Sequence, residues 1–164
     1  MDLHIAAIAQ GLFLVACANI APVLLKKLIG GRCAWPLDFG ATLADGRPLF
    51  GKSKTLRGIV VAAAASALAA PFVGVGAGVG ALTGLASMAG DLASSFVKRR
   101  LGVPPSGEAR YLDQIPEAVF GLMAAALALP LGPLDIALGA LAFLVGQILG
   151  SRLFYALGLR DEPH

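Results

Sequence analysis

The sequence contains few charged and few aromatic residues for a chain of its length. Charged residues make up 14% and aromatic residues 7% of the 164 positions, whereas roughly 25% of the residues of a soluble domain are charged. Hydrophobic residues account for 57%, and the mean hydropathy is +0.80. This composition excludes an ordinary soluble domain and predicts an integral membrane protein, in which abundant alanine and glycine let helices approach closely.

Cysteine and histidine are also scarce, with two residues of each type. Cys17 lies in an apolar run and Cys33 in a polar one, so we expect no structural disulfide, and the lack of a CxxC pair removes the usual cysteine metal site. The first residues carry Asp2 and neither lysine nor arginine. We therefore expect the first apolar run to be a retained helix and not a cleavable signal peptide.

Long apolar runs are present, and proline and glycine separate them. A helix needs about 20 residues to cross a bilayer, with a range of about 17–25. We expect membrane helices at residues 5–25, 58–72, 75–97, 116–131 and 136–157, with breaks at 71–74 and 130–133. The chain then forms a single domain of residues 1–164, with polar loops at about 26–57 and 98–115.

The basic residues gather in those two polar loops. They are Lys26, Lys27, Arg32, Arg47, Lys52, Lys54, Arg57, Lys98, Arg99, Arg100 and Arg110, followed by Arg152 and Arg160 near the C-terminus. With five spans, all of them fall on one face of the membrane, which the positive-inside rule makes cytoplasmic. The sequence predicts an all-α integral membrane protein with five transmembrane helices, an outside N-terminus and a cytoplasmic C-terminus, in the cytoplasmic (inner) membrane.

Residues 46–53, GRPLFGKS, match the P-loop pattern GxxxxGK[ST]. A P-loop needs a buried strand before it and a helix opening from it, and the preceding WPLDFG is typical of a loop. We therefore reject a nucleotide-hydrolysing P-loop. Two interpretations of this basic loop stay open: it sets the membrane topology, or it forms a clamp for phosphates in which glycines allow close backbone approach.

A second polar group interrupts the third apolar run, in GDLASSFVKRR at residues 90–100. An aspartate at the centre of a membrane helix costs about 2.5–3.5 kcal/mol on insertion scales, so such residues usually face a cavity. Asp91, Ser94, Ser95 and Lys98 have i, i+3, i+4, i+7 spacing, which places them on one helix face. They form either a site for metal and phosphate or an Asp–Lys pair that only stabilises helix packing.

Two further polar positions have a structural and a functional interpretation. Asp113 precedes Pro116, so it is either the N-cap of the fourth helix or a partner of Asp91 around Mg²⁺, with Glu117 close behind. Asn19 either satisfies the backbone carbonyl that Pro22 leaves free or faces the polar cavity. We expect Asp135 to cap the fifth helix at the outer surface.

The stretches PLDFG, DGRPLFGKSKTLRG, GDLASSFVKRRLG and LDQ, preceded by Asn19 and Pro22, resemble the CDP-archaeol synthases, CTP-dependent cytidylyltransferases of membrane lipid synthesis. The resemblance covers nearly the whole chain, with the motifs in the family's order. Lys52, Ser53 and Leu56 stand where the archaeal family usually has Asp, His and Trp. Residues 95–99 also resemble the start of the phosphatidate cytidylyltransferase signature, although two prolines stand where its Lys-Asp pair is expected.

The resemblance implies that CTP and a lipid phosphate, archaeol-phosphate-like or phosphatidate-like, give a CDP-lipid and pyrophosphate on the cytoplasmic side. It implies an Mg²⁺ cofactor held by Asp91 and Asp113, with Lys98 as the third catalytic residue. The residues expected to bind CTP and its phosphates are Lys54, Thr55, Arg57, Ser94, Ser95, Arg99, Asp45 and Gly46. Asn19 and Asp38 are expected to line the cavity for the lipid phosphate.

The expected partners are CTP, the lipid phosphate and membrane lipids, without nucleic acid, and a homodimer stays open. A small transporter or channel for anions would use the same intramembrane aspartate and basic rim without chemistry. Transporters place polar groups near the bilayer midplane, whereas the polar residues here crowd one face. A structural assembly factor is a third reading, and it leaves the face of Asp91 unexplained.

Overall fold

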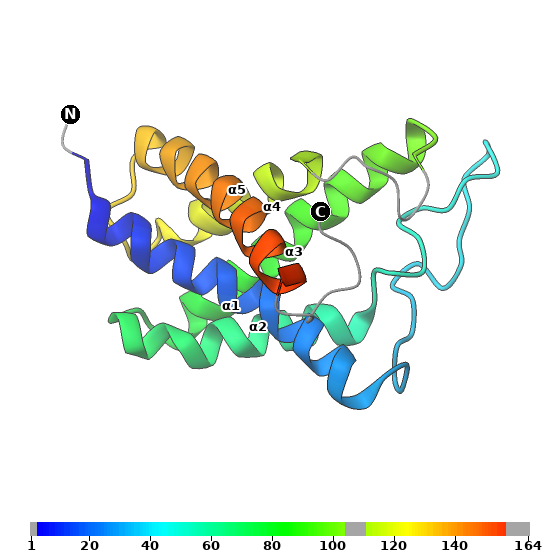
Figure 1. The fold of residues 1–164 in the computed structure, drawn as a ribbon, viewed down its shortest axis with the longest axis horizontal. Coiled ribbons are helices and arrows are strands. Elements are labelled where there is room, and N and C mark those ends of the chain that lie inside the picture. The colour runs from blue at the N-terminus through cyan, green and yellow to red at the C-terminus, as the bar shows by residue number, and fades with distance from the viewer. Residues whose placement is uncertain (1–2, 104–110, 157–164) are drawn as a thin grey trace.

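The fold is given by a computed structural model, which describes residues 3–103 and 111–156, and the side chains of residues 3–103 and 113–150. Within these ranges the chain is helical and contains no strand. The elements are α1 (Ile5–Ile29), α2 (Leu56–Ala69), the 3-10 helix η1 (Ala70–Val73), α3 (Ala77–Arg100), α4 (Tyr111–Ala125) and α5 (Pro133–Ala156) (Figure 1). The all-α prediction is therefore confirmed for the described residues.

The helices form a bundle in which α1 and α3 are central. α1 contacts α2, α3, α4 and α5, and α3 packs against α1, α2 and α4. The loop of residues 30–55 extends from one end of the bundle, which we call the loop end, and the N-terminus lies at the opposite end (Figure 1). The C-terminus of α1, the N-terminus of α2 and the C-terminus of α3 therefore meet at the loop end.

The bundle places apolar side chains outside and several polar side chains inside. Leu28, Leu68 and Phe72 are among its most exposed side chains. The buried polar side chains of the helices include Ser66, Thr83, Ser87, Ser94, Ser95, Lys98, Arg99 and Glu117. An apolar outer surface around a polar interior suits a protein that is surrounded by lipid.

Small residues allow α3 to approach its neighbours closely. A Cβ atom on Gly84 would lie 2.6 Å from the carbonyl oxygen of Ala62 in α2. A Cβ atom on Gly90 would collide with the carbonyl oxygen of Pro116 in α4. Close backbone approach over small residues is the usual way in which membrane helices pack. It fixes the position of α4, and hence of its acidic residues, relative to α3.

The predicted helices are present, with boundaries that differ from the predicted ones by up to six residues, most at α4. Helix α2 begins at Leu56 because the Thr55 side chain caps it, accepting a hydrogen bond from the Gly58 amide at 3.1 Å. The prediction of residues 116–131 for the fourth helix is wrong, since α4 spans Tyr111–Ala125 and contains Pro116. A proline was expected to mark its start. The predicted break before α3 is confirmed at η1, where Gly74 has a φ of 72°.

Three helical segments are long and apolar enough to cross a membrane: Ile5–Ile29, Leu56–Val73 and Pro133–Gly150. Helix α3 has the length, with 24 residues, but Asp91 and the cluster Lys98, Arg99 and Arg100 lower its hydropathy. Helix α4 has only 15 described residues. The chain is therefore an integral membrane protein by three apolar helices, and α3 and α4 are the helices that carry the polar residues.

The loop of residues 30–55 folds back on itself without forming a strand. Isolated bridges join Pro36 to Thr55 and Thr42 to Pro48, and the Leu37 amide donates a 2.8 Å hydrogen bond to the Lys54 carbonyl. Gly46 lies in a turn with a φ of 72°. Since no strand precedes Gly46 in this described loop, the rejection of the P-loop is confirmed.

Candidate active site

Lys54 and Asp91 form an ion pair between the end of the loop and α3. The Lys54 ammonium lies 2.6 and 2.7 Å from the two carboxylate oxygens of Asp91, and both side chains are largely buried. Thr55, the next residue, caps α2 and so fixes the backbone from which Lys54 projects. The contact brings together the loop motif and the aspartate of α3, which the sequence places 37 residues apart.

A second ion pair links α3 to α4. The Lys98 ammonium donates a hydrogen bond to Oδ2 of Asp113, and Lys98 is buried. The proposed Asp91–Lys98 pair is wrong, because Asp91 pairs with Lys54 and Lys98 pairs with Asp113. The N-cap interpretation of Asp113 is also wrong, because this residue lies inside the first turn of α4 and its side chain accepts from Lys98.

A third polar contact links α1 to α4. The Asn19 amide donates a hydrogen bond to Oε1 of Glu117, and the Glu117 side chain is buried. Glu117 lies within electrostatic range of Asp91, Lys54 and Asp113. Asn19 therefore contacts the acidic cluster directly, and Glu117 belongs to this cluster and does not merely support it from outside.

The remaining α3 residues of the predicted site lie around these pairs. The Ser94 hydroxyl donates a 2.8 Å hydrogen bond to the Asp91 carbonyl, within its own helix. The hydroxyl of Ser95 and the Nε of Arg99 are buried without a hydrogen-bond partner. The Arg99 Nη1 donates to the Val103 carbonyl, and its Nε lies 3.6 Å from where a Cβ of Gly51 would be. Ser95 and Arg99 thus have unused donors beneath the loop.

Asp38 organises the loop. Its carboxylate accepts hydrogen bonds from the amides of Gly51, Phe50 and Gly40, at 2.9, 3.0 and 3.1 Å. Burial raises the pKa of the Asp38 carboxyl, but the hydrogen bonds from these amides outweigh burial and hold the pKa below its usual value. Both oxygens of Asp38 are occupied by loop backbone, so the structure places this residue in the support of the loop.

Arg100 and Arg47 fasten the loop to the end of α3. The Arg100 guanidinium lies 2.6 Å from both oxygens of Asp45, donates to the Pro48 carbonyl at 2.6 Å and stacks over the Phe96 ring. Arg47 donates in return to the carbonyls of Arg99 and Arg100. These contacts satisfy carbonyls that a helix C-terminus leaves free. The Arg47 backbone amide and the Arg100 side chain hold the pKa of the exposed Asp45 carboxyl below its usual value.

Arg57 points to a different part of the loop. Its guanidinium donates a 3.0 Å hydrogen bond to the Gly30 carbonyl and a second one to the Arg32 carbonyl. These bonds close the C-terminal end of α1, where Lys26 and Lys27 already favour the helix dipole. Gly46 lies in the turn next to Asp45, at the tip of the loop. Arg57 and Gly46 are therefore not brought to the Lys–Asp pairs.

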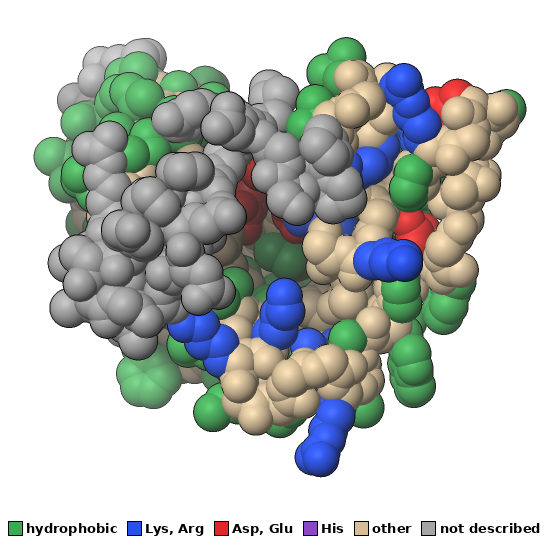
Figure 2. Space-filling view, turned by 45° about the vertical axis from the view of Figure 1, so that its right-hand side comes forward, with side chains coloured by type: hydrophobic (Ala, Val, Ile, Leu, Met, Phe, Trp, Pro, Cys, Tyr) green, Lys and Arg blue, Asp and Glu red, His purple; other side chains and the backbone are tan. Residues whose placement is uncertain are grey.

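The basic side chains spread over the loop end of the molecule, and acidic side chains lie in a hollow in the middle of this face (Figure 2). The Lys54–Asp91 and Lys98–Asp113 pairs bring ammonium and carboxylate groups together at this end of the molecule. Positive groups already hydrogen-bonded to carboxylates are suited to exchange these partners for phosphate oxygens. The arrangement can therefore bind a polyphosphate.

The carboxylates fit a hard cation such as Mg²⁺, which prefers oxygen ligands and keeps some water. Oδ1 of Asp113 is buried without a hydrogen-bond partner, as an unfilled ligand position would be. Among the described side chains, no group of three or more His, Cys, Asp or Glu residues is arranged to hold a metal ion. A cation here would therefore need ligands from water or substrate in addition to Asp91 and Asp113.

Reasoning from the sequence did not find the contacts that cross between distant segments. Arg100, Arg47 and Phe96 form the link between loop and α3, yet only their charge or apolarity was evident. The pairing of Lys54 with Asp91 was also missed. The one available signal was the density of lysine and arginine in both loops. This density does not determine which aspartate or glutamate each basic side chain contacts.

Comparison with known proteins identifies the family of the chain. The chain matches the family described as CarS-like, CDP-archaeol synthase, over residues 4–77 and 72–164. It is 36% identical over 156 residues to a CDP-archaeol synthase of Aeropyrum pernix, covering 89% of this chain and 84% of that relative. It is 41% identical over 118 residues to a CDP-archaeol synthase of Methanopyrus kandleri, covering 66% of this chain and 64% of that relative.

A solved structure described as an intramembrane enzyme for archaeal membrane lipids biosynthesis has the same fold. It matches with a TM-score of 0.70 and 32% sequence identity, over 86% of this chain and 90% of that chain. The family match spans all the elements that carry the Lys–Asp pairs. The chain therefore belongs to the CDP-archaeol synthase family.

Proposed function

We infer that this protein is a membrane cytidylyltransferase that transfers CMP from CTP to a lipid phosphate and releases pyrophosphate. The observation that carries the inference is the pair of ion pairs Lys54–Asp91 and Lys98–Asp113, which lie together at the loop end of a membrane bundle. Family membership supports the same reaction, since the relatives are CDP-archaeol synthases.

In this reaction an oxygen of the lipid phosphate attacks the α-phosphorus of CTP. The new bond joins this oxygen to the α-phosphorus, while the bond from the α-phosphorus to the bridging oxygen of the β-phosphate breaks. The electron pair of the broken bond leaves with pyrophosphate. No covalent enzyme intermediate is required, so catalysis rests on positioning and on neutralising phosphate charge.

The chain's basic residues neutralise that charge. Lys54 and Lys98 release their carboxylate partners and turn to phosphate oxygens, and the unused Nε of Arg99 is a further donor. Such exchange keeps each ammonium paired before and after substrate binds, which avoids leaving a charge unpaired in a mostly buried site. The backbone of the loop at Gly51 lies next to Arg99 and borders the site.

Asp91 and Asp113 would hold Mg²⁺ when CTP is present. When bound, such an ion would supply charge neutralisation for the triphosphate and the leaving pyrophosphate. The support for this proposal is the unpartnered Oδ1 of Asp113 and the electrostatic proximity of Asp91, Asp113 and Glu117. Isothermal titration of the preformed Mg²⁺–CTP complex into the protein should show binding that Asp91→Asn and Asp113→Asn weaken, whereas CTP with a chelator should bind the wild type more weakly.

The reaction requires the loop end to face the cytoplasm, where CTP is found. We propose five spans in the cytoplasmic membrane, with the N-terminus outside and the C-terminus and active site on the cytoplasmic side, supported by the basic residues of the loop end. Cys33 is exposed in the loop and provides a natural probe, while Phe72 is exposed at the opposite end. An impermeant thiol reagent added outside should leave Cys33 unlabelled but label a Cys33→Ser/Phe72→Cys variant.

The reaction itself can be tested with purified protein in proteoliposomes. We expect labelled CTP and an ether-linked or ester-linked lipid phosphate to give a CDP-lipid that mass spectrometry identifies, and the preferred linkage shows whether the substrate is archaeol-phosphate-like or phosphatidate-like. Absence of product with both lipids would refute the inference. Movement of phosphate or CTP across the bilayer without product would favour the anion transporter. We expect no dependence on nucleic acid, and a homodimer stays a prediction.

A further inference from the structure

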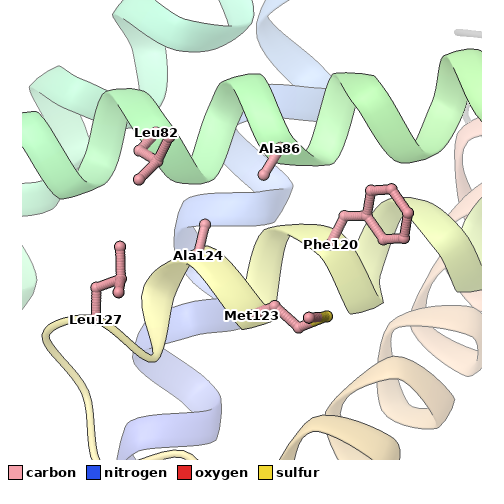
Figure 3. A pocket seen from close by; sticks show the side chains of 6 residues that line it. All are labelled: Leu82, Ala86, Phe120, Met123, Ala124 and Leu127. Carbon is pink, nitrogen blue, oxygen red and sulfur yellow. The ribbon is translucent and has the colours of Figure 1, made fainter.

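We propose that the apolar groove between α3 and α4 holds one hydrocarbon chain of the lipid phosphate, so that it is the tail subsite of the proposed reaction. The groove has a volume of about 340 Å³. Leu82 and Ala86 of α3 line it together with Phe120, Met123, Ala124 and Leu127 of α4 and the following turn (Figure 3). The inference rests on the proposed function.

The groove lies on the same helix face as an aspartate of the proposed site. Asp113, Phe120 and Ala124 follow i, i+7, i+11 spacing, which places them along one stripe of α4. Phe120 lies about 10 Å from Asp113 along the helix axis, and Ala124 about 16 Å. A lipid phosphate held at Lys98 would therefore direct its chain along this stripe toward the groove.

The close contact of Gly90 with Pro116 aligns α3 with α4 along the axis of the bundle. Ala86 lies one turn beyond Gly90, and Phe120 lies one turn beyond Pro116, in the direction away from the loop end. Leu82 and Ala124 follow after one further turn. Along the bundle, the charged site comes first, then the Gly90–Pro116 contact, and then the groove. A lipid phosphate has the same order, with the phosphate followed by the hydrocarbon chain.

The lining suits a hydrocarbon chain and not a polar ligand. All six lining residues are apolar, and Phe120, Met123, Leu127 and Leu82 are exposed on the surface of the bundle. Such a groove opens sideways to the bilayer, so a lipid can enter it without leaving the membrane. The flexible thioether of Met123 adapts to chains of different shape.

Filling the groove tests the proposal. In proteoliposomes, Ala124→Phe should raise the KM for dihexadecylglycerol phosphate about tenfold, because the new ring excludes several methylene groups. The KM for CTP should be unchanged, and so should turnover of dibutylglycerol phosphate, whose chains end before Phe120. Ala142→Phe, on the exposed surface of α5, is the matched control and should behave as the wild type. An equal loss with both lipids, or no loss with either, would overturn the proposal.

A binding measurement separates this proposal from the proposed function. Dihexadecylglycerol phosphate with a diazirine in the middle of one chain should label the residues from Phe120 to Leu127 on illumination. Unlabelled dihexadecylglycerol phosphate should compete, whereas the neutral dihexadecylglycerol should not. Such labelling without any CDP-lipid product would keep the groove and refute the reaction. Equal competition by the neutral lipid would show ordinary bilayer contact and would overturn the proposal. Disulfide formation between two Met123→Cys copies, without lipid labelling, would also overturn it, because it would show that a second copy of the chain covers the groove.

Discussion

The loop end and the opposite end of the bundle use polar side chains differently. At the opposite end, Asp135 accepts hydrogen bonds from the backbone amides of Gly132 and His4, at 2.9 and 3.0 Å, and contacts the His4 ring. Asp135 lies in the first turn of α5, and its side chain closes the start of this helix by accepting from the Gly132 amide that precedes it. The predicted role at the helix start is therefore confirmed, although Asp135 is not the N-cap residue, and its place at the outer surface stays a prediction. At the loop end, lysines from the loop and α3 meet aspartates of α3 and α4.

The difference lies in what the partners are. Backbone amides at the opposite end cannot leave, so Asp135 is fixed in a structural role. At the loop end Asp38 is likewise held by backbone amides. Asp91 and Asp113, in contrast, are paired with lysine side chains, which can rotate away to bind another anion and so free a cation site. Partial burial makes each unpaired charge costly, which favours exchange of partners over their simple loss. The contrast identifies the loop end as the part of the molecule where a charged substrate is accommodated.

Replacing Asp91 should have the largest effect. We expect Asp91→Asn to lower the rate of CDP-lipid formation by about a thousandfold, because Lys54 loses its charged partner and the cation site loses a ligand. His4→Ala at the opposite end is the control and should change the rate less than about twofold. Labelled CTP measures the rate, and gel filtration in detergent checks folding. Wild-type activity in Asp91→Asn would remove the distinction between the two ends.

Replacing Lys54 should have the next largest effect. Lys54→Ala is expected to lower kcat/KM about a hundredfold, since it removes one phosphate donor and leaves Asp91 unpaired. Lys52, two residues earlier and exposed, offers a matched control, and Lys52→Ala should cost only a few-fold. Steady-state kinetics with both substrates separates the two variants. Equal losses in the two would indicate that only the overall positive charge of the loop matters.

The link between Asp45 and Arg100 should have a smaller effect on activity. We expect Arg100→Ala to raise the KM for CTP severalfold with little change in kcat, because the loop loses its attachment to α3 while the Lys–Asp pairs remain. Asp45→Asn should raise the KM for CTP less, since Arg100 keeps its hydrogen bonds to backbone carbonyls. A double variant that only adds the two single effects would show that the ion pair itself contributes nothing.

The smallest effect should be the pH dependence that Asp38 gives to the loop. Its folded pKa is lowered, so its stabilisation is fully present above the unfolded pKa and is lost as the pH falls through the folded value. Asp38→Asn should remove this acid-induced loosening. Trp35, the single tryptophan, lies in the loop and reports it by fluorescence. If the Trp35 fluorescence of the variant changes at the same acid pH as that of the wild type, a group other than Asp38 causes the transition.

The sequence predicted the helices well because long apolar runs and Pro-Gly breaks determine them locally. It failed at α4, where Pro116 lies inside the helix and Asp113 is not a cap. The polar residues of the site were found by their cost in lipid, which singles out Asp91 and its neighbours. Their pairing depends on how α3, α4 and the loop pack, in particular on the Gly90–Pro116 contact, and one chain's sequence does not contain that arrangement explicitly.

The most direct test of the account is the rate of Mg²⁺-dependent CDP-lipid formation by Asp113→Asn in proteoliposomes. Asparagine keeps the size of the side chain and can still accept a hydrogen bond from Lys98, so the packing of α3 on α4 should persist. The account predicts loss of activity by at least about a hundredfold with normal membrane insertion. Turnover at the wild-type rate would show that Asp113 only joins two helices and would contradict the proposed site.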